Sequence, residues 1–169
     1  MTTQGFDGVL NQNLDDGDED SGETVAPAHA ARQRSKEYSM QSAVTNLNVL
    51  VVDDQQMMRD FITARLRELG ISQVALAASA TEALKQLHEE KFDLIISDWI
   101  MPDMTGLDLV KAVRGHPVLK KMPIIMASTW PGRDQMEQAK AEGVDHYLVK
   151  PFQTVQLRDS LHDIFGTVQ

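Results

Sequence analysis

The chain has 169 residues, 42% of them hydrophobic, and a formal net charge of −9, so it can bury one hydrophobic core but hardly two. It has no cysteine, which excludes disulfides, thiolate zinc sites and cysteine nucleophiles and is typical of a reducing compartment. Clustered Lys and Arg, an apolar stretch of ~20 residues and a secretory signal are all absent, so we expect a cytoplasmic protein without a nucleic-acid surface or membrane insertion.

Residues 1–46 form an acidic segment. They carry eight acidic and three basic side chains, a net charge of −5, whereas residues 47–169 carry −4. The stretch from Asp15 to Glu23 has no large apolar group to offset the entropy cost of ordering the backbone. We predict a disordered tail over 1–46, either solvated or docked on a basic partner or on the domain itself, and a folded domain over 47–169.

The first part of 47–169 predicts two strand–helix pairs. Asn48 to Val52 is a β-branched run typical of a strand, and the following helix ends at Gly70. Its expected buried face consists of Met57, Met58, Phe61, Ile62, Leu66 and Leu69. A second strand is predicted over Val74 to Ala78. Ser79 to Glu82 then has capping-box spacing, at the start of a helix that buries Ala83, Leu84 and Leu87.

The rest of the chain predicts three more pairs. Strands are expected over 94–97, 124–127 and 146–149, and helices over 107–114, over 133–142 and after Lys150-Pro151. The helix over 133–142 has Met136 as its main apolar group and should be the most loosely packed. The last helix is expected to bury Leu157, Leu161, Ile164 and Phe165. This alternation predicts an α/β fold, a doubly wound parallel sheet with helices on both faces.

A charged or hydroxyl side chain follows four of the five predicted strands. Asp53 and Asp54 follow the first, and Asp98, Ser128 and Lys150 follow the third, fourth and fifth. The carboxyl ends of parallel strands share one edge, where open α/β sheets bind their ligands. Three neighbouring carboxylates repel one another, and Mg²⁺, which prefers such oxygen ligands, would relieve the repulsion.

The same residues suit the handling of a phosphoryl group. A carboxylate can act as a nucleophile and form an acyl phosphate, and phosphoryl transfer mainly needs positioning and charge neutralisation. Asp98 is the best nucleophile candidate, because it is the single acid at the end of an expected central strand. Lys150 and Ser128 would contact phosphoryl oxygens, with Mg²⁺ as the cofactor.

Several motifs resemble those of response regulator receiver domains, in particular the single-domain chemotaxis regulators of the CheY type. These motifs are Val51-Val52-Asp53-Asp54, Ile96-Ser97-Asp98-Trp99 with Met101-Pro102, Gly106, and Lys150-Pro151-Phe152. The resemblance covers about residues 47–166 and includes the spacing between motifs. It implies a flavodoxin- and CheY-like sheet of five parallel strands in the order 2-1-3-4-5, with five helices.

The resemblance also implies a role for each site residue. Asp98 would be the phosphoacceptor, with Lys150 and Ser128 as further catalytic residues and a cis Lys150–Pro151 bond. The metal ligands would be Asp53, Asp54, Asp98 and the backbone carbonyl of Ile100. Ser128 and Tyr147 would form the switch: the Tyr147 ring turns inward when Ser128 moves toward the phosphoryl group. The surface made by 133–142, 146–149 and the last helix would then change its affinity for an effector.

Three positions depart from the chemotaxis type that the chain resembles, and one of them, Ser160, stands where the regulator that binds the flagellar switch has a basic residue, which argues against binding to that switch. Ile100 stands two residues after Asp98, where that type has a polar residue, and Trp130 stands two residues after Ser128 in place of an acidic or small one. Both would line the route of the attacking water, so we expect slower autodephosphorylation than in fast chemotaxis regulators. Trp99 and Trp130 are expected at the rim of the site, partly exposed.

The predicted function is that of a phosphorylation-activated switch in a two-component His-Asp phosphorelay, of the kind used in chemotaxis or motility signalling. The implied partners are a histidine kinase as phosphodonor, a protein effector and a phosphatase, and the protein is expected to be a monomer or weak dimer. It would catalyse only its own phosphorylation and autodephosphorylation. The alternatives are a phosphate sink without an effector, a module that signals without phosphorylation, and a Mg²⁺-dependent phosphatase of the haloacid-dehalogenase class. The adjacent Asp53-Asp54 pair and the short chain disfavour the phosphatase.

Overall fold

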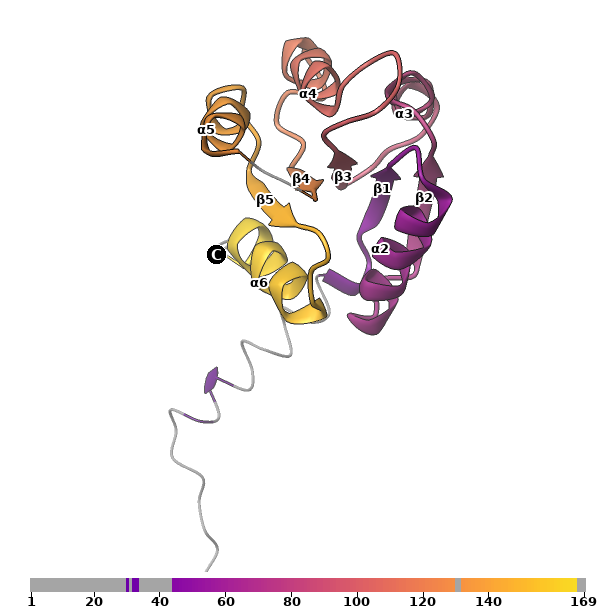
Figure 1. The fold of residues 1–169 in the computed structure, drawn as a ribbon. Coiled ribbons are helices and arrows are strands. Elements are labelled where there is room, and N and C mark those ends of the chain that lie inside the picture. Colours follow the sequence, from indigo (N-terminus) through magenta and orange to yellow (C-terminus); the bar gives the residue numbers. More distant parts are fainter. Residues whose placement is uncertain (1–29, 31, 34–43, 130–131, 167–169) are drawn as a thin grey trace, which may run out of the picture.

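Five parallel strands form one sheet in the order β2-β1-β3-β4-β5 (Figure 1). The computed structural model describes residues 30, 32–33, 44–129 and 132–166, so most of the predicted tail and Trp130 lie outside the described residues. The strands are β1 (Asn48–Val52), β2 (Gln73–Ala77), β3 (Leu94–Asp98), β4 (Ile124–Ser128) and β5 (His146–Val149). Every residue of β3 and β4 is buried, as expected for central strands covered on both faces. The predicted fold class and strand order are confirmed.

Helices cover both faces of the sheet. They are α2 (Gln56–Glu68), α3 (Ala80–Glu89), α4 (Gly106–Gly115), α5 (Arg133–Ala141) and α6 (Thr154–Phe165). Figure 1 shows α2 and α6 on one side of the sheet and α3, α4 and α5 on the other. Alternate strand residues supply the two cores: Val49 and Val51 pack with the first pair of helices, and Leu50 and Val52 with the other three.

Side-chain caps fix where two of these helices begin. The Ser79 hydroxyl accepts from the Glu82 N–H at the start of α3, as the sequence predicts, although the Glu82 carboxylate accepts from Ala78. At α4 the capping box is complete, because the Thr105 hydroxyl accepts from the Asp108 N–H and the Asp108 carboxylate accepts from the Thr105 N–H, both at 3.1 Å. The α4 box sets the helix start close to the end of β3.

Some local predictions are wrong. Met57, in the first turn of α2, is 69% exposed, and the buried residues of this helix begin at Ile62. Met136 is the largest apolar side chain of α5, as noted from the sequence, but it is 43% exposed and the buried residue of the helix is Ala139. Strand β2 runs one residue earlier than predicted, from Gln73. With one buried residue, α5 has the smallest buried face of the helices described, in line with the expectation of loose packing.

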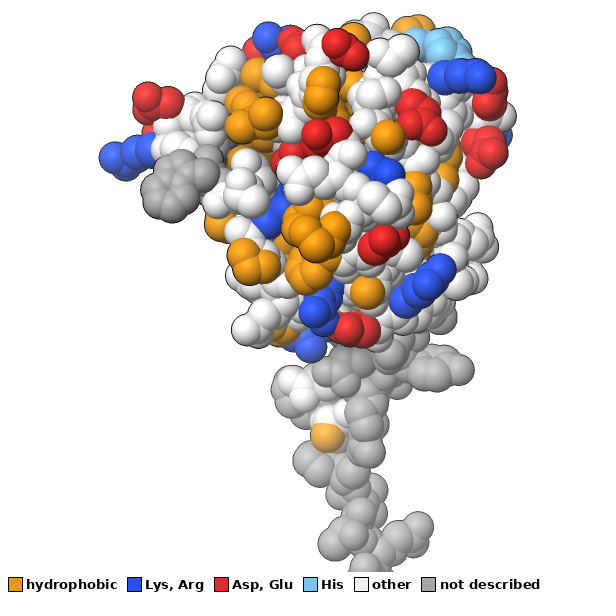
Figure 2. Space-filling model, turned by 45° about the vertical axis from the view of Figure 1, so that its right-hand side comes forward, with side chains coloured by type: hydrophobic (Ala, Val, Ile, Leu, Met, Phe, Trp, Pro, Cys, Tyr) orange, Lys and Arg blue, Asp and Glu red, His pale blue; other side chains and the backbone are white. Residues whose placement is uncertain are grey.

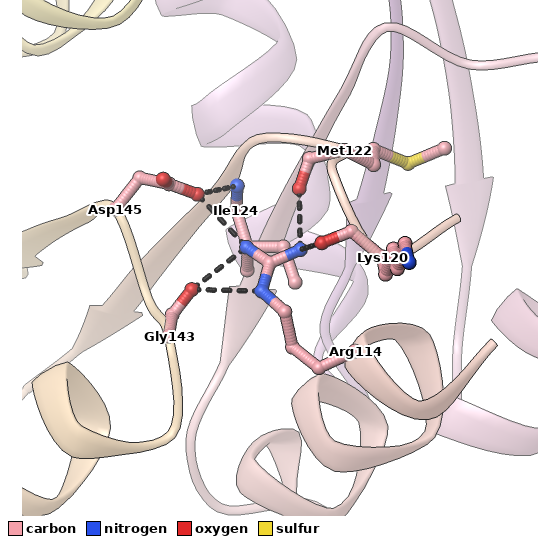
Figure 3. Close-up of polar contacts among 6 residues, drawn as sticks. All are labelled: Arg114, Lys120, Met122, Ile124, Gly143 and Asp145. Atoms are coloured by element: carbon pink, nitrogen blue, oxygen red, sulfur yellow. Dashed lines mark hydrogen bonds and ion pairs between the residues drawn. The ribbon is translucent and has the colours of Figure 1, made fainter. Parts of the chain in front are cut away.

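Arg114, near the end of α4, ties together the loops at the amino ends of β4 and β5 (Figure 3). Its guanidinium donates to the backbone carbonyls of Lys120, Met122 and Gly143 at 2.7 to 3.1 Å. It also pairs with Asp145 at 2.9 Å, and the same carboxylate oxygen accepts from the Ile124 N–H at 2.8 Å. We call this set the Arg114 clamp. Gly143, at φ 92°, leaves no room for a side chain beside Arg114, since a Cβ there would lie 2.9 Å from Nε.

The surface mixes charges of both signs. Figure 2 shows acidic, basic and hydrophobic side chains interspersed on one face, without a continuous field of Lys and Arg among the coloured residues. Within the described ranges, no helix is both long and apolar enough to cross a membrane.

Candidate functional site

Four neighbouring strands bring the predicted site residues to one edge of the sheet. Asp98 and Ser128 are the last residues of β3 and β4, Asp53 follows β1, and Lys150 follows β5. All four side chains are buried, whereas that of Asp54 is exposed. A cleft of about 480 Å³ opens at this edge, and its lining includes Asp54, Asp98, Ile100, Ser128 and Lys150. The residues expected to meet are therefore brought together, apart from Trp130, which is not described.

Lys150 lies between two carboxylates. Its Nζ is 2.5 Å from Asp53 Oδ2 and 3.2 Å from Asp98 Oδ1, and the residue is only 6% exposed. The backbone N–H of Lys150 donates to the Ser128 carbonyl, which extends the pairing of β4 and β5 to this position. The Lys150–Pro151 bond is cis, as the resemblance implies. A buried ammonium with two acidic partners compensates part of the repulsion between them.

Asp53, Asp54 and Asp98 form a group that could hold a metal ion. Each can offer one carboxylate oxygen such that the three oxygens lie within 4.8 Å of one another. Asp53 Oδ1, the oxygen that does not contact Lys150, accepts a hydrogen bond from the Gln55 N–H at 2.9 Å. Three carboxylate oxygens beside an open cleft are a hard donor set, which fits Mg²⁺ better than softer metals.

The pKa of Asp98 is raised above its ordinary value of 3.8, mainly because burial disfavours the charged form. The Lys150 ammonium opposes this shift, and the carboxylate of Asp53 adds to it. The Trp99 backbone N–H also lowers the pKa of Asp98, because it favours the ionised form. The negative charge of the Asp98 carboxylate is thus only partly balanced by Lys150. This suits Asp98 to react with an electrophile or to bind a cation.

Ser128 and Tyr147 lie on the adjacent strands β4 and β5, and of the two only Ser128 lines the cleft. The Tyr147 hydroxyl is buried and has no hydrogen bond of good geometry among the described residues. Burial raises the pKa of Tyr147, the nearby Ser128 hydroxyl opposes the shift, and the Asp98 carboxylate adds to it. The ring packs 6.5 Å from that of Trp99, centroid to centroid, so in this structure Tyr147 is turned toward the site.

Trp99 and Ile100 are placed differently from each other. The prediction that Trp99 is partly exposed is wrong: it is 8% exposed, because its indole packs into the core beside Tyr147. Ile100 lines the cleft but is 69% exposed, so most of its side chain faces solvent at the rim. Trp130, the other predicted rim residue, lies outside the described residues.

Two residues that support the site were not singled out for it from the sequence. Arg59 in α2 donates to the Asp53 carbonyl at 2.6 Å, and Gly106 at the start of α4 donates to the Trp99 carbonyl at 2.8 Å. Gly106 figured only as part of the resemblance. Neither contact has a signal in the local pattern, because each depends on how a helix meets a strand end.

The comparisons with known proteins agree with this geometry. A sequence profile described as response regulator receiver domain matches residues 49–162. The chain is similar to the chemotaxis protein CheY of Pseudomonas aeruginosa, with 42% identity over 122 residues that make up 72% of this chain and 98% of that protein. It is 38% identical to the chemotaxis protein CheY-3 of Vibrio cholerae over 120 residues, 71% of this chain and 92% of that one.

Solved structures give the same result. The crystallised chemotaxis response regulator CheY4 of Vibrio cholerae superposes with a TM-score of 0.63 at 38% identity and covers 69% of this chain and 97% of that one. A putative response regulator from Chloroflexus aurantiacus gives a TM-score of 0.66 at 32% identity, covering 70% and 96%. With the sheet order and the strand-end residues described above, these matches show that the chain belongs to the response regulator receiver domain family.

Proposed function

We propose that this receiver domain is a phosphorylation-activated switch in which Asp98 accepts a phosphoryl group from a partner histidine kinase. The observation that carries the proposal is the contact of Lys150 with both Asp53 and Asp98, beside Ser128, at the mouth of one cleft. An ammonium held within hydrogen-bond reach of the acceptor carboxylate can neutralise a phosphoryl oxygen as charge is transferred. The relatives named as chemotaxis proteins support a role in chemotaxis or motility signalling.

The reaction follows from the chemistry of the acceptor. An oxygen of the Asp98 carboxylate attacks phosphorus, a P–O bond forms, and the P–N bond to the kinase histidine breaks with its electron pair left on the imidazole. Lys150 and the Ser128 hydroxyl then contact the oxygens of the acyl phosphate. Mg²⁺, held by Asp53, Asp54, Asp98 and the Ile100 carbonyl, would supply further charge neutralisation. Hydrolysis of the same acyl phosphate resets the switch.

The signal would leave the site through Ser128 and Tyr147. Tyr147 lies in β5, between α5 and α6, and its hydroxyl is close to Ser128. Each of these three elements exposes one large hydrophobic side chain: Met136 in α5 at 43%, Val149 in β5 at 46% and Val155 in α6 at 41%. A change in the positions of Ser128 and Tyr147 would alter this face, which we assign to binding the protein effector.

The phosphoacceptor role is tested by incubating the purified protein with acetyl phosphate and Mg²⁺ and measuring the mass of the intact chain. Addition of one phosphoryl group is expected, with no addition to Asp98→Asn, because an amide oxygen does not form the acyl phosphate. Asp103→Asn is the matched control, since Asp103 is an exposed aspartate in the loop after β3. Labelling of Asp98→Asn at the wild-type level would contradict the proposal.

The effector role is tested separately. Immobilised protein is expected to retain a specific partner only with the phosphoryl mimic beryllofluoride and Mg²⁺. Labelling without any such partner would instead identify a phosphate sink. Sustained turnover of a generic phosphomonoester would favour the phosphatase.

A further inference from the structure

We propose that Gly106 and Ser97 are positioning residues that fix the main chain of Asp98 and of the loop that follows it. The inference rests on the proposed function, because it concerns how the phosphoacceptor and the Ile100 carbonyl are held in place. Both residues act on backbone atoms, so their role is distinct from that of the side chains that face the cleft.

Only glycine fits at position 106, because any side chain there would collide with the main chain of Asp98. A Cβ built on this residue would lie 2.0 Å from the Asp98 carbonyl oxygen and 3.0 Å from its carbonyl carbon. These are backbone atoms at the end of a buried central strand, so they cannot turn aside as a flexible side chain can. The first turn of α4 therefore lies directly on the main chain of Asp98, at a distance that only glycine permits.

Ser97 contacts the same carbonyl from within the core. Its side chain is fully buried, and its hydroxyl donates to the Asp98 carbonyl at 3.0 Å. A buried hydroxyl without a partner costs free energy, so this bond holds the carbonyl and the hydroxyl together. The Asp98 carbonyl is thus fixed by Ser97 and, through the close approach of α4, by Gly106.

The planarity of the peptide bond carries this constraint to the reactive side chain. The Asp98 carbonyl and the Trp99 N–H belong to one planar peptide unit that starts at the Asp98 Cα, so fixing this carbonyl also orients the bond from which the acceptor side chain projects. The next unit is held as well, because the Gly106 N–H donates to the Trp99 carbonyl at 2.8 Å. Two consecutive peptide units are therefore fixed just before the Ile100 carbonyl, and a shift of α4 would move the acceptor carboxylate and that carbonyl together.

The test compares Gly106→Ala with Gly115→Ala, a matched control in the same helix, where an added Cβ would meet nothing within 4 Å. Both are made with Trp130→Phe, so that Trp99 is the only remaining tryptophan and its fluorescence reports Mg²⁺ titrations. Gly106→Ala is expected to weaken Mg²⁺ binding about tenfold, and Gly115→Ala by less than about twofold. The rate of labelling by acetyl phosphate should fall about tenfold as well.

Amide hydrogen exchange without metal gives a second readout. The Trp99 and residue-106 amides should exchange faster in Gly106→Ala than in Gly115→Ala, under conditions where urea unfolding shows both to be folded. Mg²⁺ affinity, labelling rate and amide exchange all within about twofold of Gly115→Ala would overturn the proposal, since a 1 Å displacement near the chemistry costs far more than that.

Ser97→Ala decides the question if Gly106→Ala does not fold. It is compared with Ser160→Ala, another buried serine whose hydroxyl donates to a backbone carbonyl, in α6. An approximately threefold loss of Mg²⁺ affinity in Ser97→Ala alone supports the proposal, and equal affinities overturn it. Failure of the wild type to label contradicts the proposed function, whereas the Mg²⁺ titration and amide exchange decide the positioning role in either case.

Discussion

Lys150 is the residue on which the charge balance of the cleft depends. It is buried against Asp53 and Asp98, so Lys150→Met leaves two facing carboxylates without their cation. We expect the free energy of unfolding to fall by about 3 kcal/mol, measured by urea denaturation in EDTA, because an unpaired buried charge is costly. Added Mg²⁺ should stabilise the variant more than the wild type.

An exposed lysine provides the comparison for Lys150. Lys140 in α5 is exposed, and Lys140→Met should change the free energy of unfolding by about 0.5 kcal/mol or less. Similar losses of unfolding free energy in Lys150→Met and Lys140→Met would show that the Lys150 ammonium stabilises the fold no more than an exposed lysine does.

The lifetime of the acyl phosphate is predicted to depend on Ile100 and Trp130. Ile100 lies at the rim of the cleft with most of its side chain in solvent, so it covers Asp98 incompletely. We therefore expect Trp130→Ala to shorten the lifetime by about tenfold, which corresponds to about 1.4 kcal/mol in the barrier to hydrolysis. Release of inorganic phosphate from the labelled protein measures this. A wild-type half-life of seconds that Trp130→Ala leaves unchanged would refute the shielding argument.

At the scale of the element, the start of α4 depends on a titratable cap. The Thr105 hydroxyl and N–H lower the pKa of Asp108 below its ordinary value of 3.8. A carboxyl with a lowered pKa in the folded state stabilises the fold at pH values above its ordinary pKa, and this contribution is lost as pH falls through the folded-state pKa. Asp108→Ala should therefore lower the urea midpoint at pH 7, and the difference from wild type should shrink as the pH falls below about 4.

A control variant at a second acidic residue distinguishes the effect of the Asp108 cap from the effect of a negative charge on the helix dipole. Asp134 also lies in the first turn of a helix, α5, and Asp134→Ala removes a charge that favours the helix dipole. If Asp108→Ala and Asp134→Ala show the same shift of the urea midpoint and the same pH dependence, the hydrogen bonds between Asp108 and Thr105 contribute nothing to the stability of the fold. Thr105→Ala, which removes the N-cap hydroxyl, should cost about 1 kcal/mol.

At the scale of the whole molecule, the division into a tail over 1–46 and a domain over 47–169 is a prediction that truncation tests. Val44 and Leu47 pack against the core formed with α2 and α6. Removal of residues 1–43 should thus leave the melting temperature and acetyl phosphate labelling unchanged. Removal of 1–47 should lower the free energy of unfolding by about 2 kcal/mol, because buried apolar surface is lost. A large loss of stability on removal of 1–43 would show that the tail is part of the folded domain.

The fold was predictable because its main signals are local. Buried parallel strands are apolar along their whole length, so runs such as Leu94 to Ser97 stand out, and polar residues mark the strand ends that form the cleft. The motifs around Asp98 and Lys150 added the strand order, which the periodicity alone does not give.

What the sequence did not predict depends on distances between elements. Trp99 is buried in a core cluster that Tyr147 of β5 also joins, whereas Met57, in the first turn of α2, is exposed. The close approach of Gly106 to Asp98 requires the position of a whole helix relative to a strand. Contacts of this kind between elements leave no periodic signal in the sequence, so hydrophobic patterning cannot predict them.

The Arg114 clamp holds the carboxyl end of α5 in place. Arg114 holds the residues just after α5, and Lys111 pairs with Glu142 at 3.6 Å on the same side. The other end, at Arg133, follows the loop that leaves Ser128. With nine residues at a rise of ~1.5 Å each, α5 is about 13 Å long. If phosphorylation displaces Ser128 as proposed, we expect the amino end of α5 at Arg133 to move further than its carboxyl end, which the Arg114 clamp holds.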